Sequence, residues 1–195
     1  MTREELRRQM RKARRALPPE VRRAASIAAA LNLSATRHYQ DARRIAVYLA
    51  MDGELDPTPL VLRARSDGRE VYLPVLPPKD GPMSFRLYVE DAPLTPNRFG
   101  IPEPVSGDLL AAKDVDLVVT PLVGFDLSGN RMGMGAGFYD RTFDFLKTAP
   151  QRHPALIGYG YAMQRMPSLT RETWDVPLAG VVTEQQFHPC DSPGN

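Results

Sequence analysis

The residues best suited to chemistry lie in one glycine-rich segment, residues 130–141, which reads NRMGMGAGFYDR. Its glycines alternate with other residues, and the pattern from about Phe138 onward predicts a helix. Glycines let main-chain amides approach an anion closely, and a helix N-terminus adds free N–H groups and a favourable dipole. Arg131 adds a side chain that can bind phosphate oxygens in bidentate fashion. The segment therefore predicts a phosphate site of the nest type.

Two common phosphate-binding motifs do not match this segment. No Gly-Lys-Ser/Thr follows the glycines, which excludes a P-loop, and Phe138 stands where the dinucleotide fingerprint requires a glycine. By spacing alone, a simple glycine-rich turn before a helix explains the segment equally well. The identity of a ligand stays open at this level.

The elements around the segment predict an α/β fold with a mostly parallel sheet flanked by helices, in a single three-layer domain. Periodic apolar residues predict helices over residues 6–17, 21–31, 57–65 and 138–147. Apolar or alternating runs predict strands over residues 44–51, 70–75, 83–89, 116–123, 155–160 and 180–183. The sequence shows no linker, so we expect one domain over residues 1–187 and a polar tail over residues 188–195.

Local signals support one strand–helix–strand unit in particular. Asp56 followed by Pro57 is typical of a helix N-cap with proline at the first helical position. The turn Ser66-Asp67-Gly68 separates this helix from the next strand. Two strands joined by a helix with short loops predict a parallel crossover.

The bulk composition limits the setting in which the protein works. The chain has 195 residues, of which 43% are hydrophobic and 25% charged, as in a globular domain. Its single cysteine, Cys190, cannot form an internal disulfide. No apolar run approaches the ~18 residues that a membrane span needs. We expect a cytoplasmic protein with no membrane partner.

A cluster of positive charge marks the N-terminus, although the net charge of the whole chain is only +2. Such a cluster could meet nucleic acid, a membrane or an acidic small molecule, or it could be a solvated helix face. It contains no interleaved aromatic residue and no zinc-finger or RNA-recognition motif, so we expect no nucleic-acid partner. The cluster consists of Arg3, Arg7, Arg8, Arg11, Lys12, Arg14 and Arg15.

The segment at residues 130–141 resembles the R-L-G-x-G-x-G-[FY]-Y-D motif of the 5-formyltetrahydrofolate cyclo-ligases, also called methenyltetrahydrofolate synthetases. Arg3-Glu4-Glu5-Leu6-Arg7 is similar to the family's K-x-x-L-R, with arginine in place of the lysine. Further similar segments follow in the family's order, at residues 51–56 (MDGELD), 71–75 (VYLPV), 100–104 (GIPEP), 174–178 (WDVPL) and 182–184 (VTE). The resemblance thus covers nearly the whole chain.

This resemblance implies an activity and its cofactors. Members of the family cyclise 5-formyltetrahydrofolate to 5,10-methenyltetrahydrofolate, using ATP and Mg²⁺ and releasing ADP and phosphate. Phosphorylation of the formyl oxygen would make it a leaving group for attack by the neighbouring nitrogen. The resemblance also implies a fold like NagB, RpiA and the CoA transferases, and a small-molecule folate substrate, with or without a polyglutamate tail. We expect a monomer.

The resemblance also assigns residues to roles. For ATP it implies Arg3, Arg7, Arg131, Met132, Gly133, Met134, Gly135, Ala136, Gly137, Phe138 and Tyr139. For folate it implies Met51, Glu54, Met134, Gly135, Ala136, Gly137 and Phe138. It implies Mg²⁺ ligation by Asp140 and Asp175, and catalytic roles for Arg131 and Tyr139. Because Met134 and Ala136 carry no charge, neutralisation of phosphate falls to arginines outside the loop.

Several of these residues also have a purely structural explanation. Asp140 could complement a helix dipole, Asp175 could be a turn residue, and Glu54 could be a solvated loop acid. Tyr139 could belong to an apolar helical stripe with Phe143. A different α/β enzyme, such as a sugar-phosphate isomerase, would fit the same fold but would leave the segment around Glu54 unexplained.

Overall fold

The centre of the molecule is a mixed sheet of eight strands, in the order β12-β11-β10-β7-β1-β2-β3-β6. The computed structural model describes residues 2–148 and 153–190. The five central strands run parallel to one another. They are β11 (Gly180–Val182), β10 (Ala155–Tyr159), β7 (Leu117–Pro121), β1 (Arg44–Ala46) and β2 (Glu70–Val75).

The edges of the sheet are antiparallel. On one side β12 (Phe187–Pro189) pairs with β11, and on the other β3 (Ser84–Leu87) and β6 (Leu109–Leu110) extend the sheet beyond β2. Two small hairpins lie outside the sheet. They are formed by β4 (Leu94–Pro96) with β5 (Pro102–Pro104), and by β8 (Gly124–Phe125) with β9 (Arg131–Met132).

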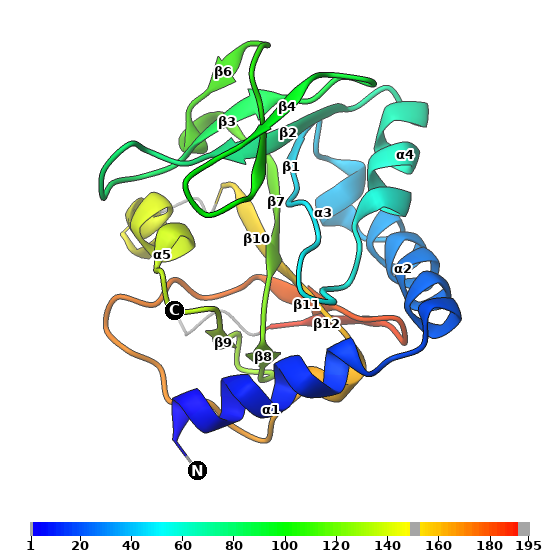
Figure 1. Ribbon diagram of the computed structural model, residues 1–195, viewed down its shortest axis with the longest axis vertical. Helices are drawn as coiled ribbons and strands as arrows, with labels where there is room; N and C mark the ends of the chain where they lie inside the picture. Colours follow the sequence, from blue (N-terminus) through cyan, green and yellow to red (C-terminus); the bar gives the residue numbers. More distant parts are fainter. Residues whose placement is uncertain (1, 149–152, 191–195) are drawn as a thin grey trace.

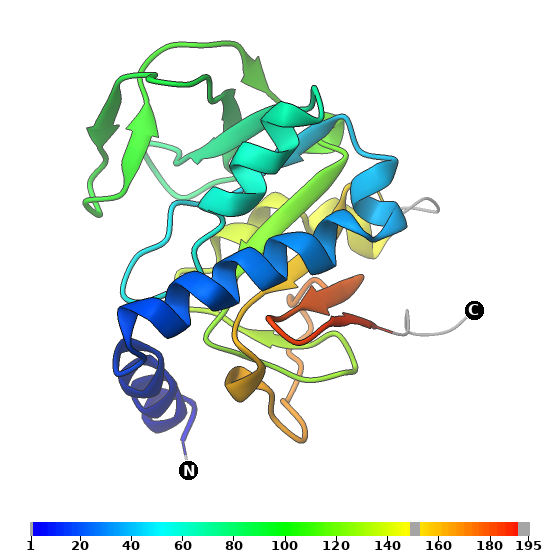
Figure 2. The same cartoon turned by 90° about the vertical axis from the view of Figure 1, so that its right-hand side faces the viewer.

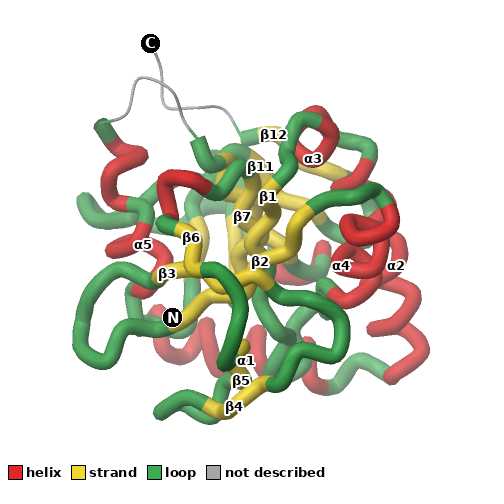
Figure 3. The backbone as a smooth tube through the Cα atoms, turned by 90° about the horizontal axis from the view of Figure 1, so that it is seen from above, coloured by secondary structure: helices red, strands yellow, loops and turns green. Residues whose placement is uncertain are grey.

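Helices cover both faces of the sheet, which confirms the predicted three-layer α/β fold (Figures 1 and 3). One face carries α2 (Pro19–Ser34), α3 (Arg37–Gln40) and α4 (Thr58–Ser66). Figure 2 shows α2 running across this face with α4 beside it. The other face carries α5 (Phe138–Thr142), and the 3₁₀ turn η2 (Asp144–Lys147) follows it.

Side chains that alternate along the central strands contribute to a hydrophobic core on each face of the sheet. Leu117 and Val119 pack toward α2 and α4, whereas Val118 between them packs toward Phe143 on the opposite face. Side chains of a strand point alternately to its two faces, so a continuous apolar run such as β7 is what a sheet covered on both sides requires. The strand predicted from that run is confirmed.

The first helix, α1 (Arg3–Arg15), belongs to neither layer. It lies across the end of the sheet next to β8 and β9 (Figure 1). Thr2 caps its N-terminus in a capping box with Glu5, whose main-chain N–H donates to the threonine hydroxyl. Its inner face packs Leu6 and Met10 against Met132 of β9.

Some predicted boundaries were wrong. The strand predicted over residues 44–51 ends at Ala46, because the chain then leaves the sheet toward a turn with positive φ at Asp52 and Gly53. The helix predicted over residues 138–147 breaks at Phe143, which has φ −108° and is fully buried in the core. Tertiary packing of this ring overrides the helical pattern.

Two further differences concern ends of elements. Helix α4 begins at Thr58 rather than at Pro57, although the Asp56 carboxylate still accepts hydrogen bonds from the Thr58 N–H and hydroxyl. At the other end of the chain, β12 includes His188, and Cys190 is buried. The predicted start of a tail at residue 188 therefore falls inside a strand, while residues 191–195 lie outside the described part of the chain.

Remaining short elements are 3₁₀ turns at η1 (Ala112–Asp114) and η3 (Ala162–Gln164). Within residues 2–148 and 153–190, no helix has the length and apolar character needed to cross a membrane.

Candidate active site

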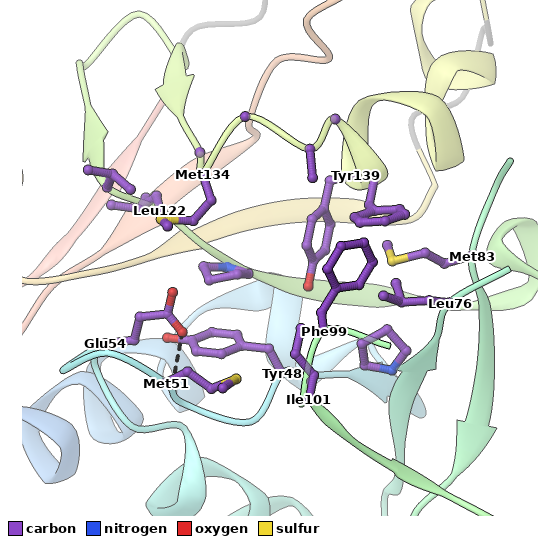
Figure 4. Close-up of a pocket in the computed structure, with 18 of the residues that line it drawn as sticks. Tyr48, Met51, Glu54, Leu76, Met83, Phe99, Ile101, Leu122, Met134 and Tyr139 are labelled. Atoms are coloured by element: carbon purple, nitrogen blue, oxygen red, sulfur yellow. Dashed lines mark hydrogen bonds between the residues drawn. The ribbon is translucent and has the colours of Figure 1, made fainter. Parts of the chain in front are cut away.

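A cavity of about 670 Å³ opens where the parallel strands β1, β2 and β7 end. This is the usual place for ligands in open α/β sheets, because loops leaving the carboxyl ends of the strands surround a crevice there. Figure 4 shows side chains entering the cavity from segments far apart in sequence. The lining segments include residues 48–54, 73–76, 97–103, 121–123, 131–140 and 174–175, together with arginines of α1.

One side of the cavity is formed by residues 131–140, here called the glycine-rich wall. Gly135 has φ +101° and Gly137 has φ +67°, the left-handed region that glycine adopts without cost. Gly133 has no positive φ, and a Cβ added there would meet nothing within 4 Å. Two of the three glycines are thus required by the path of the chain, and the third leaves open space beside the main chain.

The helix after the glycines is shorter than predicted. It has five residues, with Gly137 as its N-cap. Such a helix has a small macrodipole, so it adds less positive potential to this wall than a longer helix would.

Two buried groups hold the glycine-rich wall in place from behind. The Asp126 carboxylate accepts hydrogen bonds from the main-chain N–H groups of Ser128, Asn130 and Leu169. Met132 is fully buried in a cluster with Val123 and does not line the cavity. Met132 was expected among the residues that bind ATP, and the strand alternation of β9 turns its side chain into the core.

Arg131 reaches the cavity but is held by partners inside the protein. Its guanidinium donates to the Val176 carbonyl and forms an ion pair with Asp140, and only 7% of its side chain is exposed. Asp140 also accepts a hydrogen bond of 3.1 Å from the Val176 N–H. The arrangement fixes the guanidinium plane at the cavity wall and links the glycine-rich wall to the segment carrying Asp175.

Both residues expected to bind Mg²⁺ line the same cavity. The contacts described for Asp140 go to Oδ1, and Oδ2 of Asp175 accepts a hydrogen bond of 2.9 Å from the Glu172 N–H. Among the described residues, no group of three or more His, Cys, Asp or Glu side chains could hold a metal by itself. Two carboxylates suit Mg²⁺ when phosphates and water complete its shell.

The two arginines expected near ATP come from the first half of α1. Arg7 Nε donates to the Gly133 carbonyl at 2.9 Å, which ties the helix to the glycine-rich wall. Arg3 lies at the rim and pairs with Glu172 at 3.3 Å, with 40% of its side chain exposed. Both line the cavity, so the structure brings them to the predicted site.

Opposite lies the carboxylate wall, formed by the lining residues 48–54 (Figure 4). The Glu54 carboxylate accepts a hydrogen bond of 3.1 Å from the Met51 N–H, and only 13% of its side chain is exposed. Burial raises the pKa of this carboxyl, and the nearby Arg14 partly opposes the shift. Glu54 is therefore a half-enclosed acceptor and not a solvated loop acid.

Aromatic rings fill the space between the two walls. Tyr48 and Tyr139 enter from opposite sides, and the Tyr139 hydroxyl points toward the side that holds Glu54 (Figure 4). Burial, with a smaller contribution from Glu54, raises the pKa of Tyr139 far above its usual range, so its hydroxyl stays protonated. The Tyr139 and Phe143 rings stack at 6.4 Å, so Tyr139 is both a core residue and a lining residue.

The β4–β5 hairpin closes a third side. The ring of Phe99 meets Phe138 edge to face at 5.8 Å across the cavity mouth. Asn97 shapes the loop by accepting hydrogen bonds from two main-chain N–H groups and donating to Glu103 at 2.8 Å. Glu103 in turn accepts a hydrogen bond of 2.8 Å from the Leu76 N–H at the end of β2.

Sequence reasoning missed several lining residues, namely Arg14, Tyr48, Asp52, Phe99, Ile101, Leu122 and Trp174. Phe99 stands directly before the GIPEP segment and Trp174 directly before Asp175, so proximity to recognised motifs was an available signal. Tyr48 looked like an ordinary residue of an apolar strand. Arg14 lies four residues after Met10, so helical spacing placed it on the apolar face of its helix, and this signal was not used.

Together these features define an α/β protein with one cavity, in which a glycine-rich wall with arginines faces a wall that carries a carboxylate and aromatic rings. A model of the 5-formyltetrahydrofolate cyclo-ligase family matches residues 1–184 of the chain. The protein therefore belongs to the 5-formyltetrahydrofolate cyclo-ligase family, as the sequence motifs predicted.

Individual relatives agree with this assignment. The chain is 40% identical over 180 residues to the 5-formyltetrahydrofolate cyclo-ligase of Escherichia coli (strain K12), covering 89% of this chain and 96% of that protein. It is 39% identical over 156 residues to the Haemophilus influenzae protein of the same name, covering 78% and 80%. The structure of Aquifex aeolicus 5,10-methenyltetrahydrofolate synthetase matches with a TM-score of 0.83 at 31% identity, covering 100% of this chain and 96% of that one.

Proposed function

We propose that this protein catalyses the ATP-dependent cyclisation of 5-formyltetrahydrofolate to 5,10-methenyltetrahydrofolate, with release of ADP and phosphate. The observation that carries the proposal is the meeting of two walls across one cavity. A glycine loop suited to phosphate faces a half-enclosed carboxylate with aromatic rings between them. The names of the relatives supply the reaction, and the cavity supplies a place for both reactants.

The chemistry explains why two reactants must meet. A formamide carbon is a weak electrophile, and its oxygen is a poor leaving group. Transfer of the γ-phosphoryl group to the formyl oxygen releases ADP and makes that oxygen part of a phosphate ester, a good leaving group, and the neighbouring nitrogen then attacks the carbon. The C–O bond breaks, phosphate leaves, and the nitrogen loses its proton. The protein must align the formyl oxygen with the γ-phosphorus and exclude water that would compete.

On this proposal, the main chain of the glycine-rich wall holds the ATP phosphates. Met134 and Ala136 carry no charge, so neutralisation falls to Arg7 and Arg131, with Arg3 at the rim. Arg131 is already fixed by Asp140 and Val176, so it would need no reordering to stabilise charge on the transferred group. Met132 would take part only through its main chain.

The folate would lie against the carboxylate wall. A pterin ring carries N–H donors, and the Glu54 carboxylate is placed to accept from them in a largely apolar pocket. Met51, Phe138 and Tyr139 would pack against the ring. The protonated Tyr139 hydroxyl could donate to the formyl group and help to orient its oxygen.

Asp140 and Asp175 fit Mg²⁺ because both present hard oxygen ligands to the cavity beside the glycine-rich wall. The chemistry that Mg²⁺ would supply there is positive charge beside the ATP phosphates. Asp140 and Asp175 would each contribute the carboxylate oxygen that the described hydrogen bonds leave available.

One assay tests the proposal. Purified protein is mixed with 5-formyltetrahydrofolate, ATP and Mg²⁺, and the methenyl absorbance is followed. We expect product formation that requires ATP. A folded protein that forms no product under these conditions would refute the proposal, and a sugar-phosphate isomerase would turn over its own substrate without ATP.

Three narrower features also belong to the proposal. We infer a monomer, a cytoplasmic location consistent with a single cysteine, and acceptance of polyglutamylated folate. Size-exclusion chromatography with light scattering tests the first. Comparing mono- and triglutamate substrates in the assay tests the last.

A further inference from the structure

The carboxylate wall is supported by a buried arginine to which the proposed reaction gives no role. Arg14 lies in the last turn of α1, lines the cavity and is 0% exposed as a residue. Burying a guanidinium carries a large desolvation cost unless close partners compensate for it. The partners of Arg14 therefore indicate why it is there.

Those partners lie in two segments that contact α1, the turn at residues 52–54 and the end of β7. Arg14 Nε donates to the Asp52 carbonyl at 2.9 Å, and Nη2 donates to the Asp52 carboxylate at 3.1 Å. The same Nη2 lies 3.6 Å from Glu54 Oε1, and Nη1 donates to the Leu122 carbonyl at 3.3 Å. One planar fork thus connects α1, the turn that carries Glu54, and the end of β7.

The turn needs such support because its main chain is unusual. Asp52 has φ +52° and Gly53 has φ +74°, so two consecutive residues are left-handed. For a non-glycine residue this conformation is strained, so the surrounding structure must hold it. A Cβ at Gly53 would lie 3.2 Å from the Arg15 Cα, which shows how closely α1 packs on this turn.

We propose that Arg14 is a positioning residue that holds the Glu54 carboxylate in the orientation at which it contacts the folate. This inference rests on the proposed function, in which Glu54 accepts hydrogen bonds from the pterin. Lysine would not replace Arg14, because a point charge with one nitrogen cannot reach Asp52, Glu54 and Leu122 together. The role should be selective for folate, because Arg7, the α1 residue assigned above to ATP, lies two turns earlier and contacts Gly133 of the glycine-rich wall.

The main test compares Arg14→Gln with a matched control on the same turn of helix. Arg15 also pairs with Asp52, at 3.2 Å, but its side chain is 54% exposed and no contact with Glu54 or Leu122 is found for it in the described structure. In steady-state assays we expect Arg14→Gln to raise the KM for 5-formyltetrahydrofolate about tenfold and to change the KM for ATP less than twofold. Arg15→Gln should change neither KM more than twofold.

A double-mutant cycle separates positioning from general destabilisation. If Arg14 acts through Glu54, then Arg14→Gln should add less than a twofold rise in folate KM when Glu54→Gln is already present. A purely structural role predicts a lower melting temperature with unchanged folate KM in the folded single variant. That result, or a full additional rise in the double variant, would overturn the inference.

Two further measurements keep the inference testable. If Arg14→Gln does not fold, Asp52→Asn retains the guanidinium but weakens its anchor, and an unchanged folate KM in that variant also overturns the inference. Calorimetric binding of 5-formyltetrahydrofolate without ATP separates the two proposals. Absent turnover by the unmodified protein rejects the proposed reaction, whereas equal folate affinity of that protein and Arg14→Gln rejects the role of Arg14.

Discussion

The two walls of the cavity are built on different principles. The glycine-rich wall offers main-chain amides, and its one fixed cation, Arg131, is neutralised within the wall by Asp140. The carboxylate wall offers a side chain, Glu54, whose supporting cation comes from another element. Activity should therefore be most sensitive, at the glycine-rich wall, to substitutions that change the main-chain conformation or the Arg131–Asp140 ion pair. At the carboxylate wall, it should be most sensitive to substitutions of single charged side chains.

The largest effect on activity is expected at Arg131, which both carries charge and holds the glycine-rich wall through Asp140. Arg131→Ala removes a fixed cation at the phosphate side and leaves Asp140 without its ion-pair partner. Loss of one such preorganised donor typically costs about 10²–10³ in kcat. We expect a fall of at least about a hundredfold in kcat, with a lower melting temperature. Arg8→Ala, an exposed arginine of α1, should leave kcat within about twofold, and equal losses in both variants would argue against a fixed role.

The next effect tests the carboxylate wall through Glu54→Gln. A hydrogen bond to a charged group contributes about 1.5–3 kcal/mol, so the KM for folate should rise roughly ten- to a hundredfold. The KM for ATP should change little. Asp56→Asn is the matched control, because Asp56 lies two residues away and accepts hydrogen bonds from Thr58 at the start of α4, outside the cavity. A larger change in the KM for ATP than for folate would reverse the assignment of the two walls.

A smaller effect should distinguish glycines within the first wall. Gly135→Ala forces alanine to adopt φ +101°, at a cost of about 1–3 kcal/mol. The expected result is a rise of about tenfold in the KM for ATP. Gly133→Ala requires no positive φ and meets no atom within 4 Å, so its effect should be clearly smaller. The reverse order would mean that open space beside Gly133 matters more than loop conformation.

The mildest effect concerns pH. Burial raises the pKa of Glu54, so its charged form is lost at a higher pH than for an exposed glutamate, whose pKa is about 4.3. As pH falls, the KM for folate should therefore rise earlier than for an exposed acid. Stability should change with pH in the opposite direction to folate binding. Because the pKa of Glu54 is higher in the folded state, its protonation stabilises the fold, and this contribution to the free energy of unfolding is lost as pH rises through the folded pKa. Glu54→Gln should abolish both pH-dependent steps.

Much of the fold could be predicted because local pattern and tertiary role agree. The run that became β7 is apolar throughout, as a strand covered on both faces must be, and β1, α4 and β2 follow each other with clear turn signals. The proline-rich region after β2 could not be resolved into β4 and β5. Those strands pair only with each other and depend on the side chains of Asn97 and Glu103.

The site was predictable in its segments but not in its contacts. Motif similarity placed the glycine-rich segment and Glu54 together, although no local pattern brings residues so distant in sequence into one cavity. The inward turn of Met132 and the burial of Arg14 depend on how α1 docks. A basic helix face looks the same in sequence whether its arginines meet water or a buried carboxylate.

The docking of α1 has a consequence for how the chain folds. This helix has 13 residues, a length at which an isolated helix is marginal in water. Its anchors are Asp52 and, 126 residues after Arg7, Gly133. This helix therefore has no complete docking surface until the segment that carries Gly133 is in place, so we expect it to be among the last elements to reach its native position.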